Sequence, residues 1–528
     1  MFKILVSDKL GAAGLALLDE AEDVQYDLKT TMSKSEFLQI IPGYEGLIVR
    51  SGTPVDEDVL AAGTQLRVVG RAGVGIDNID VDAASRRGII VTNTPTANNI
   101  ATAEQALGLI IAASRHTVAA HNSVRAGEWE RSRFMGSELY GKVLGLIGFG
   151  RIGRLVAARA QAFGMEVVAY DPFVSEAVGR ELGVTLLDLE DLLPLVDYLS
   201  LHTAYTPETD QIINAAALAQ MKDGVIIVNG ARGKLIDEAA LAAALGSGKV
   251  RAAAVDVYSS EPPLNNPLIG LPNVLHTPHL GASTHEAQKE VATQIVAQVL
   301  DALRGTDFRH AVNMPFTVGP GEYQKIRPYM RLAEKLGQLQ VSLADEPIRH
   351  VEVEACGEAV EDQVKAIAAA LLKGMLSLSY DGPLNSINAP VLAEQAGITI
   401  SQTKGMNGVD YPNLVSCRVK WDGGERMLAG VLFGGAEPRI VQLDQYKVEA
   451  RPEGVLLIMQ NEDVPGVIGQ IGTILAAYKV NIGEWRMGRN EPGGQALSFI
   501  NLDSVPSQTA LLALGEITAV TKLKLVTI

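Results

Sequence analysis

Up to about residue 280, short runs of β-branched and other apolar residues alternate with stretches whose apolar residues recur at helical spacing. This alternation predicts an α/β fold with parallel sheets, because buried parallel strands read as short, continuous apolar runs. The runs that predict strands are residues 3–7, 46–50, 66–71, 143–147, 198–202, 225–229, 252–257 and 274–277. The stretches that predict helices include residues 10–18, 98–115 and 284–303.

The pattern changes after residue 316. The sequence F-T-V-G-P-G-E at residues 316–322 predicts a linker, and a long amphipathic helix is expected over residues 323–341. Alternating strands at residues 350–355 and 414–421 are typical of an α+β domain with a mainly antiparallel sheet. The last stretch, from residue 454, begins with a strand and passes through a proline-glycine turn into a helix, which predicts a compact βαββαβ-like unit.

One strand, helix, strand unit organises the chain. The apolar run 143–147 leads directly into Gly148, Gly150 and Gly153 at the G-x-G-x-x-G spacing, and a second apolar run ends at Asp171. Gly148 permits the tight turn, Gly150 lets the backbone approach a pyrophosphate, and Gly153 lets the helix pack close to the sheet. A carboxylate at Asp171 can bond the adenosine ribose, and no cation follows it to neutralise a 2′-phosphate. The predicted cofactor is therefore NAD, on a Rossmann-type doubly wound parallel sheet.

Composition bounds the remaining possibilities. A chain of 528 residues is too long for one hydrophobic core and suggests three or four domains. A net charge of -16 argues against nucleic acid or an acidic membrane surface as a partner. The two cysteines lack metal-ligand spacing, and no signal peptide or membrane-spanning run is visible. We therefore expect a cytoplasmic enzyme without a metal.

Three polar residues follow predicted strands at the edge where an open α/β sheet binds ligands: Arg232, Glu261 and His279. An arginine offers a planar fork of donors for a carboxylate and an adjacent carbonyl oxygen, a histidine exchanges a proton near neutral pH, and a glutamate fixes the histidine tautomer. Singly, Arg232 could pair with a surface acid, Glu261 could be a solvated loop carboxylate, and His279 could cap a turn. Together they predict hydride transfer between NAD and a 2-oxo or 2-hydroxy acid.

These segments also resemble a known family, the D-2-hydroxyacid dehydrogenases, and within it the long-form D-3-phosphoglycerate dehydrogenases. The similar motifs are G-R-A-G-V-G-I-D-N-I-D at residues 70–80, G-F-G-R-I-G from Gly148, N-G-A-R-G at residues 229–233, D-V-Y-S-S-E-P-P at residues 256–263 and T-P-H-L-G-A-S-T at residues 277–284. The resemblance covers essentially the whole chain. It implies a homodimer or homotetramer, and oxidation of D-3-phosphoglycerate to 3-phosphohydroxypyruvate in L-serine biosynthesis.

The resemblance also implies a domain plan. The Rossmann domain, residues 98–283, is inserted in a flavodoxin-like α/β substrate domain formed by residues 1–97 and 284–316. An intervening α+β domain, residues 317–452, and a ferredoxin-like ACT domain, residues 453–528, follow.

Further site residues come from the same resemblance. The additional NAD contacts that it implies are Val74, Arg151, Ile152, Thr203, Gly230, Ala231, Asp256, Gly281 and Ala282. It implies that Arg50, Ser51, Gly52, Arg71 and, from a neighbouring subunit, Arg131 bind the phosphorylated substrate. In the ACT unit, Asn461, Asp463 and Asn481 match positions that bind L-serine. The chain departs from the family at Gly230, where many relatives have Cys or Thr, and at Asn461, where serine-sensitive relatives often have His or Tyr.

Two other functions compete with this one. Another D-2-hydroxyacid dehydrogenase, such as a glyoxylate, hydroxypyruvate or 2-oxoglutarate reductase, would use the same catalytic groups. A NAD-sensing binding protein on a dehydrogenase scaffold would not need Arg232, Glu261 and His279 together.

Overall fold

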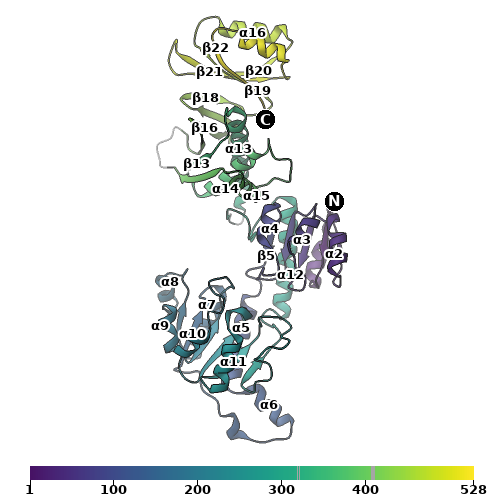
Figure 1. Cartoon of the computed structure of the whole chain (residues 1–528), viewed down its shortest axis with the longest axis vertical. Helices are drawn as coiled ribbons and strands as arrows, with labels where there is room; N and C mark the ends of the chain where they lie inside the picture. The colour runs from purple at the N-terminus through teal and green to yellow at the C-terminus, as the bar shows by residue number, and fades with distance from the viewer. Residues whose placement is uncertain (318, 320, 406–410) are drawn as a thin grey trace.

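The computed structural model describes residues 1–317, 319, 321–405 and 411–528. Within them the strands form four sheets, which follow one another along an elongated molecule (Figure 1). The sheet of the last residues lies at one end, and helix α6 (Thr117–Arg125) projects from the other. No helix in these ranges is both long and apolar enough to cross a bilayer, and no cluster of His, Cys, Asp or Glu there could hold a metal ion.

The first sheet is parallel, with the strand order β2-β1-β3-β4-β5 of flavodoxin-like folds. Its strands are β1 (Phe2–Val6), β2 (Val24–Leu28), β3 (Gly46–Val49), β4 (Val68–Arg71) and β5 (Ile90–Asn93). Its helices are α1 (Ala12–Asp19), α2 (Lys34–Ile40), α3 (Glu57–Ala62), α4 (Val81–Arg86) and, from much later in the chain, α12 (His285–Arg304). The apolar face of α12 packs on this sheet through Val291, Ile295 and Val299. After α12 the chain returns to β5, where the Val312 N–H donates to the Val91 carbonyl over 2.8 Å.

The second sheet is also parallel, in the order β12-β11-β10-β9-β6-β7-β8, which is the doubly wound Rossmann order with one extra strand. Its strands are β6 (Val143–Ile147), β7 (Glu166–Tyr170), β8 (Thr185–Leu186), β9 (Tyr198–Leu201), β10 (Val225–Asn229), β11 (Val250–Val255) and β12 (Val274–His276). Its helices are α5 (Asn99–Ser114), α7 (Arg151–Ala162), α8 (Glu176–Glu181), α9 (Leu189–Leu192), α10 (Ala215–Gln220) and α11 (Glu238–Ser247). Buried clusters on both faces of the sheet explain why its strands read as continuous apolar runs.

The third sheet has the order β14-β13-β15-β16-β17-β18 and is antiparallel except for the β13–β14 pair. Its strands are β13 (His350–Cys356), β14 (Thr399–Lys404), β15 (Leu414–Trp421), β16 (Gly424–Phe433), β17 (Glu437–Leu443) and β18 (Tyr446–Ala450). Helices α13 (Glu322–Leu343), α14 (Val364–Leu376) and α15 (Asn388–Gln395) belong to the same unit. The predicted linker at residues 316–322 lies partly outside the described residues, and Phe316 within it is buried in the core of this unit.

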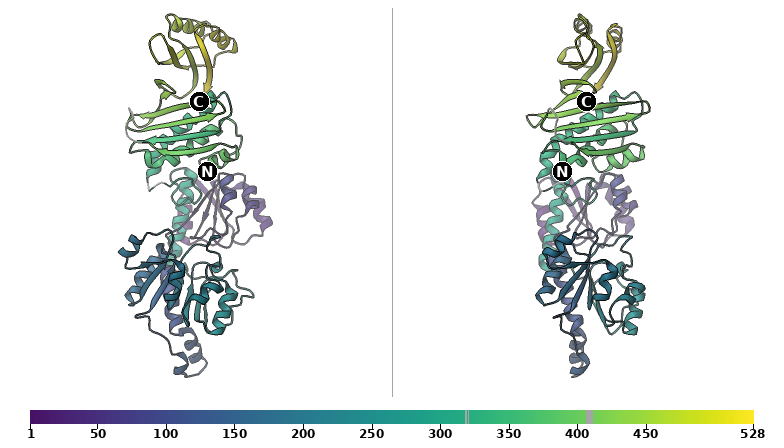
Figure 2. Two further views of the ribbon diagram at one scale, coloured as in Figure 1. Left: turned by 60° about the vertical axis from the view of Figure 1, so that its left-hand side comes forward. Right: turned by 90° about the vertical axis from the view of Figure 1, so that its left-hand side faces the viewer.

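The fourth sheet is the predicted βαββαβ unit, antiparallel in the order β20-β21-β19-β22. Its elements are β19 (Val455–Glu462), α16 (Val467–Ala477), β20 (Ile482–Arg489), β21 (Gln495–Leu502), α17 (Gln508–Gly515) and β22 (Val520–Thr527). Both helices pack on one face of the sheet, and Ile458, Leu497 and Phe499 on the other face join the core of the third unit (Figure 2). The predicted fold class is confirmed, whereas the residue limits of the four domains stay a prediction.

Candidate active site

The glycine turn between β6 and α7 has the shape that a pyrophosphate needs. Gly148 has a φ of 97°, and a Cβ there would lie 2.6 Å from the backbone of His202. A Cβ at Gly153 would lie 2.2 Å from the carbonyl oxygen of Gly148, so helix and turn are in close contact. Gly150 caps α7 without a side chain and has open space around its Cα. The N–H groups of the first helical turn are therefore accessible to a phosphate, and the residues present fit a dinucleotide.

Asp171 lies beside this turn at the end of β7. Its Oδ2 accepts from the Phe149 N–H over 2.8 Å, and its Oδ1 accepts from the Phe173 N–H over 3.0 Å. The carboxylate therefore also holds the glycine turn in place, because Phe149 stands between Gly148 and Gly150. This second role was not visible in the sequence, where only the distance to Gly153 counted.

His279 and Glu261 form a direct pair. Nδ1 of His279 and Oε2 of Glu261 are 2.8 Å apart, and the Tyr258 N–H donates to Oε1 of Glu261 over 3.2 Å. Burial raises the pKa of Glu261, but its hydrogen bond and charge interaction with His279 outweigh this and hold the pKa below the ordinary 4.5. Glu261 is therefore ionised at neutral pH, and Nε2 is the ring nitrogen of His279 that this pair leaves for a substrate.

Asp256 lies beneath the loop that carries His279. It is fully buried, and its carboxylate accepts from Thr277 Oγ1 over 2.5 Å, from the Leu280 N–H over 2.7 Å and from the Gly281 N–H over 2.8 Å. The His279 N–H donates to the Asp256 carbonyl over 2.8 Å. These bonds fix a loop in which His279 has a φ of 55°, a conformation uncommon for a side chain with a Cβ. Asp256 thus positions the histidine, and its implied NAD contact stays a prediction.

Arg232 reaches across from the second sheet to the first. Its Nε donates to Oδ2 of Asp77 over 2.8 Å, and its Nη1 donates to the Ala231 carbonyl over 2.7 Å. The guanidinium lies against Gly75, where a Cβ would be 1.7 Å from Nη2. An arginine has five N–H donors, so three remain for a ligand. Asp77 stands inside the 70–80 motif but was given no role from the sequence.

Arg71 and Arg50 belong to the first unit, and the charges of Arg232, Asp77, Arg50 and Asp8 all act on Arg71. This region between the first two sheets, with His279 and Glu261, is called the cleft below. Nε of Arg71 is buried without a hydrogen-bond partner in the part of the chain that the structure describes. Burial, followed by the charge of Arg232, lowers the pKa of Arg71 to about 10. The Arg50 N–H donates to Oδ2 of Asp8 over 2.6 Å, and Oδ1 of Asp8 lies 2.6 Å from the position of a Cβ at Gly52. Asp8, which the sequence reading also missed, therefore fixes the loop that contains Ser51. Three arginines thus gather here beside Asp8 and Asp77, and one buried donor, Nε of Arg71, has no acceptor among the described residues.

Most of the other predicted NAD residues lie just after strands of the first two sheets. The Val74 carbonyl accepts from Asn93 Nδ2 over 2.5 Å, the Ala231 N–H donates to Asn229 Oδ1 over 3.1 Å, and the Ala282 carbonyl accepts from Gln288 Nε2 over 2.8 Å. Arg151 and Ile152 begin α7, Thr203 follows β9 next to Gly148, and Gly230 follows β10 with open space at its Cα.

Arg131 is not part of the cleft of its own chain. It begins a short 3₁₀ turn (Arg131–Phe134) that is exposed and follows the projecting helix α6 (Figure 1). Any role at an active site therefore requires a second copy of the chain.

The three predicted effector residues are separated within one chain. Asn461 donates to the Glu462 carbonyl over 2.8 Å, and Asp463 accepts from Arg489 Nη1 over 3.0 Å. Asn481 donates to Asp503 Oδ2 over 2.6 Å. The strand register places Asn481 beside the start of β19, whereas Asn461 and Asp463 lie at its other end.

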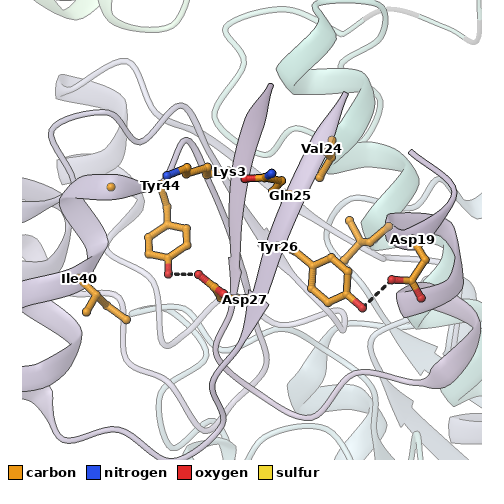
Figure 3. Close-up of a pocket in the computed structure, with 10 residues that line it drawn as sticks. Lys3, Asp19, Val24, Gln25, Tyr26, Asp27, Ile40 and Tyr44 are labelled. Atoms are coloured by element: carbon orange, nitrogen blue, oxygen red, sulfur yellow. Dashed lines mark hydrogen bonds between the residues drawn. The ribbon is translucent and has the colours of Figure 1, made fainter. Parts of the chain in front are cut away.

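A separate hollow of about 690 Å³ lies along the outer strand β2 (Figure 3). Both of its tyrosines are already paired with carboxylates, because Tyr26 donates to Asp19 over 2.9 Å and Tyr44 donates to Asp27 over 2.5 Å. None of the predicted catalytic, cofactor or substrate residues lines it.

Comparison with known proteins agrees with this geometry. A model for the NAD binding domain of D-isomer specific 2-hydroxyacid dehydrogenases matches residues 107–281, and a model for the D-3-phosphoglycerate dehydrogenase intervening domain matches residues 325–444. Among solved structures, a glyoxylate reductase from Paecilomyes thermophila is 33% identical with a TM-score of 0.55, over 59% of this chain and 98% of that one. A D-lactate dehydrogenase from Aquifex aeolicus, complexed with NAD and lactic acid, is 28% identical with a TM-score of 0.53, over 60% of this chain and all of that one. Fold and site thus define an NAD-dependent 2-hydroxyacid dehydrogenase.

Full-length relatives narrow the class further. The D-3-phosphoglycerate dehydrogenase of Methanocaldococcus jannaschii is 42% identical over 98% of both chains. That of Bacillus subtilis is 38% identical over 100% of this chain and 99% of its own, and that of Mycobacterium tuberculosis H37Rv is 42% identical over 97% of both. The chain belongs to the D-3-phosphoglycerate dehydrogenase family, as its motifs predicted, and its cofactor is NAD.

Proposed function

We propose that this enzyme oxidises D-3-phosphoglycerate to 3-phosphohydroxypyruvate with NAD, the first step of L-serine biosynthesis by the phosphorylated pathway. The observation that carries the proposal is the cluster of Arg50, Arg71 and Arg232, in which Nε of Arg71 is buried and finds no acceptor among the described residues. A substrate with a carboxylate at one end and a phosphate at the other supplies two anionic groups for this cluster. D-lactate and glycerate supply only one.

The catalytic roles follow from the contacts. NAD, when bound, accepts the hydride that leaves C2 of the substrate. His279 accepts the proton of the C2 hydroxyl at Nε2, while ionised Glu261 holds Nδ1–H and stabilises the imidazolium that forms. Arg232 donates its three remaining N–H groups to the substrate carboxylate and to the C2 oxygen, which orients C2 and stabilises charge on that oxygen. Asp77 and Asp256 position Arg232 and His279 respectively.

The substrate phosphate is assigned to Arg50, Arg71 and the Arg131 of a second copy. The loop at Ser51 and Gly52 offers backbone N–H groups for the substrate carboxylate, supported by the contact of Asp8 with the neighbouring Arg50 N–H. A homodimer or homotetramer is required for the contribution of Arg131. Residence in the cytoplasm also stays a prediction, consistent with two free, buried cysteines among the described residues.

The test is a substrate screen that follows NADH absorbance with 3-phosphoglycerate, D-lactate, glycerate and 2-hydroxyglutarate. We expect the highest kcat/KM with 3-phosphoglycerate, and a turnover lower by about 10² to 10⁴ in His279→Ala, the usual loss for a general acid or base. His285→Ala, an exposed histidine at the start of α12, is the matched control and should keep wild-type turnover. A higher kcat/KM with one of the other acids would make that acid the substrate. Near-normal turnover in His279→Ala would mean that another residue is the catalytic base.

L-serine is proposed as an effector of the ACT unit when two copies pair. Strand β20 is an outer strand of its sheet, so antiparallel pairing of two β20 strands would bring Asn481 of one copy towards Arg489 and Asp463 of the other. An amino acid between them would meet a carboxylate for its ammonium group and amides for either end. Calorimetry with L-serine on the wild type and on Asp463→Ala, beside an activity titration, tests this. Absence of both heat and inhibition at millimolar serine would leave the unit with a role in assembly alone.

A further inference from the structure

A cavity of about 90 Å³ lies between the third and fourth units, remote from the NAD cleft. One side is formed by the end of α13 and by β16 and β17, and the other by the helix-free face of the ACT sheet. Since about 10 to 15 Å³ suffices for one water, this space holds several waters or one small oxyanion. Its polar wall includes Arg426, Asp444, Gln460, Lys522 and Lys524.

Arg426 is the central feature of this cavity. The residue is only 7% exposed, and its Nη1 is buried with no hydrogen-bond partner in residues 1–317, 319, 321–405 and 411–528. Its guanidinium lies 5.2 Å from the centroid of the Trp421 ring, which fixes the direction of the side chain. The neighbouring carboxylate of Asp444 already accepts from the Met427 N–H over 2.8 Å. A buried charged donor without an acceptor is costly, so the position favours a ligand that supplies one.

The fourth unit adds two more cations. Lys522 and Lys524 alternate along β22 and therefore point to the same face, opposite Gln460 and Ile458 of β19. Both ammonium groups contact Asp345, Lys522 through a short hydrogen bond and Lys524 at 3.2 Å. Three cations and one carboxylate, Asp444, thus line the cavity, and a second carboxylate, Asp345, pairs with both lysines, in a chain whose net charge is -16. This local excess of positive charge distinguishes the cavity from a polar gap that only water fills.

We propose that this cavity binds a small tetrahedral oxyanion of the phosphate class, held by Arg426 from the third unit and by Lys522 and Lys524 from the fourth. The arginine fork matches two oxygens of such an anion, and each lysine supplies a point charge. Because the cations come from both units, the bound anion links the ACT sheet to the intervening sheet. The site shares no residue with the NAD cleft, so it does not depend on the proposed reaction.

Trp421, whose ring packs against the Arg426 guanidinium, can report on binding in the cavity. The chain has three tryptophans, Trp129, Trp421 and Trp485, so 5-fluorotryptophan labelling of the whole protein gives three fluorine NMR signals, assignable by Trp→Phe variants. Inorganic phosphate is titrated at constant ionic strength against chloride, so that non-specific screening does not change. We expect the Trp421 signal to shift saturably and the Trp129 signal to stay in place. Sulfate, which has the same shape and charge class, should shift Trp421 in the same direction.

Two variants and one control decide the assignment. Arg426→Gln should raise the dissociation constant for phosphate by about tenfold or more, the loss expected for a charged hydrogen bond. Arg418→Gln is the matched control. Arg418 lies on the adjacent strand, where its register partner is Met427 and not Arg426. Its Nη1 already donates to Glu425 over 2.6 Å. This variant should leave the constant within about twofold.

If Arg426→Gln does not fold, the double variant Lys522→Gln/Lys524→Gln takes its place, and a similar tenfold weakening is expected. The proposal is overturned if the Trp421 signal does not move. It is also overturned if the variants show the same saturable shift with the wild-type dissociation constant for phosphate.

Discussion

Gly75→Ala should disable the enzyme without unfolding it. The added Cβ would lie 1.7 Å from Nη2 of Arg232 and 2.8 Å from Oδ2 of Asp77, whereas ordinary contact begins near 3.4 Å. The guanidinium must therefore move by about 1 to 2 Å, and a misplacement of about 1 Å at a catalytic group can cost roughly 100-fold in rate. Gly75 has no positive φ that an alanine would oppose, and the displaced group is the flexible end of a side chain, so stability should change little.

The assay for this prediction compares kcat/KM for 3-phosphoglycerate, the affinity for NAD and the melting temperature. We expect kcat/KM to fall by about 100-fold, equal to about 2.7 kcal/mol of transition-state stabilisation, with NAD affinity and melting temperature near wild type. Gly43→Ala is the control, because Gly43 lies in the same unit with open space at its Cα and no positive φ. A Gly75→Ala enzyme within threefold of wild type would refute the placement of Arg232 against this loop.

Three further changes test other parts of the site. Asp171→Ala should weaken NAD binding by about tenfold or more and reduce discrimination against NADP. The reason is that the ribose loses an acceptor and the Phe149 N–H loses its hydrogen bond. Equal use of NAD and NADP by the wild type would contradict this. Because the pKa of Glu261 lies below 4.5, its contribution to stability should be complete above about pH 4.5 and be lost as the pH falls through the lower folded-state pKa. Urea unfolding of wild type and Glu261→Gln should thus show a difference in stability that shrinks as the pH falls below about 4.5, and a difference that stays unchanged down to about pH 3 would be inconsistent. Arg131→Ala should raise KM for 3-phosphoglycerate by about tenfold and leave KM for D-lactate unchanged, whereas an unaltered KM for both would make the segment a surface loop.

The parts of the fold that the sequence predicted are those governed by local patterns. Strand β10 and strand β15 have the predicted bounds, and α5 differs from its predicted range by one residue at each end. Each lies in a segment whose apolar spacing, turn residues and tertiary burial agree. The contact between His279 and Glu261 could be predicted for the same reason, since both residues follow strands at the ligand edge of one sheet.

Residues that act through contacts distant in the sequence could not be found in this way. Asp77 is an ordinary loop acid until the two sheets face each other and it meets Arg232, which is 155 positions away. Asp8 bonds the Arg50 N–H across 42 positions, and Asp256 accepts from Leu280 and Gly281 across 24 and 25. Carboxylates that position a site carry no spacing signal of their own, because their partners are fixed by sheet topology.

In the ACT unit, too, the sequence predicted suitable residue types but not the distances between them. The residue types at Asn461, Asp463 and Asn481 suit an amino-acid ligand, and their positions on strand ends were read correctly from the sequence. The register then places Asn481 at one end of the sheet and the other two at the opposite end, a separation of seven strand residues or roughly 20 Å. No zwitterion the size of serine spans that distance, so a site made of all three residues would require two copies. The cavity at Arg426 differs in kind, because its three cations already meet within one chain, where the ACT sheet packs on the intervening sheet. Serine binding should therefore depend on protein concentration through assembly, whereas phosphate binding at Arg426 should not.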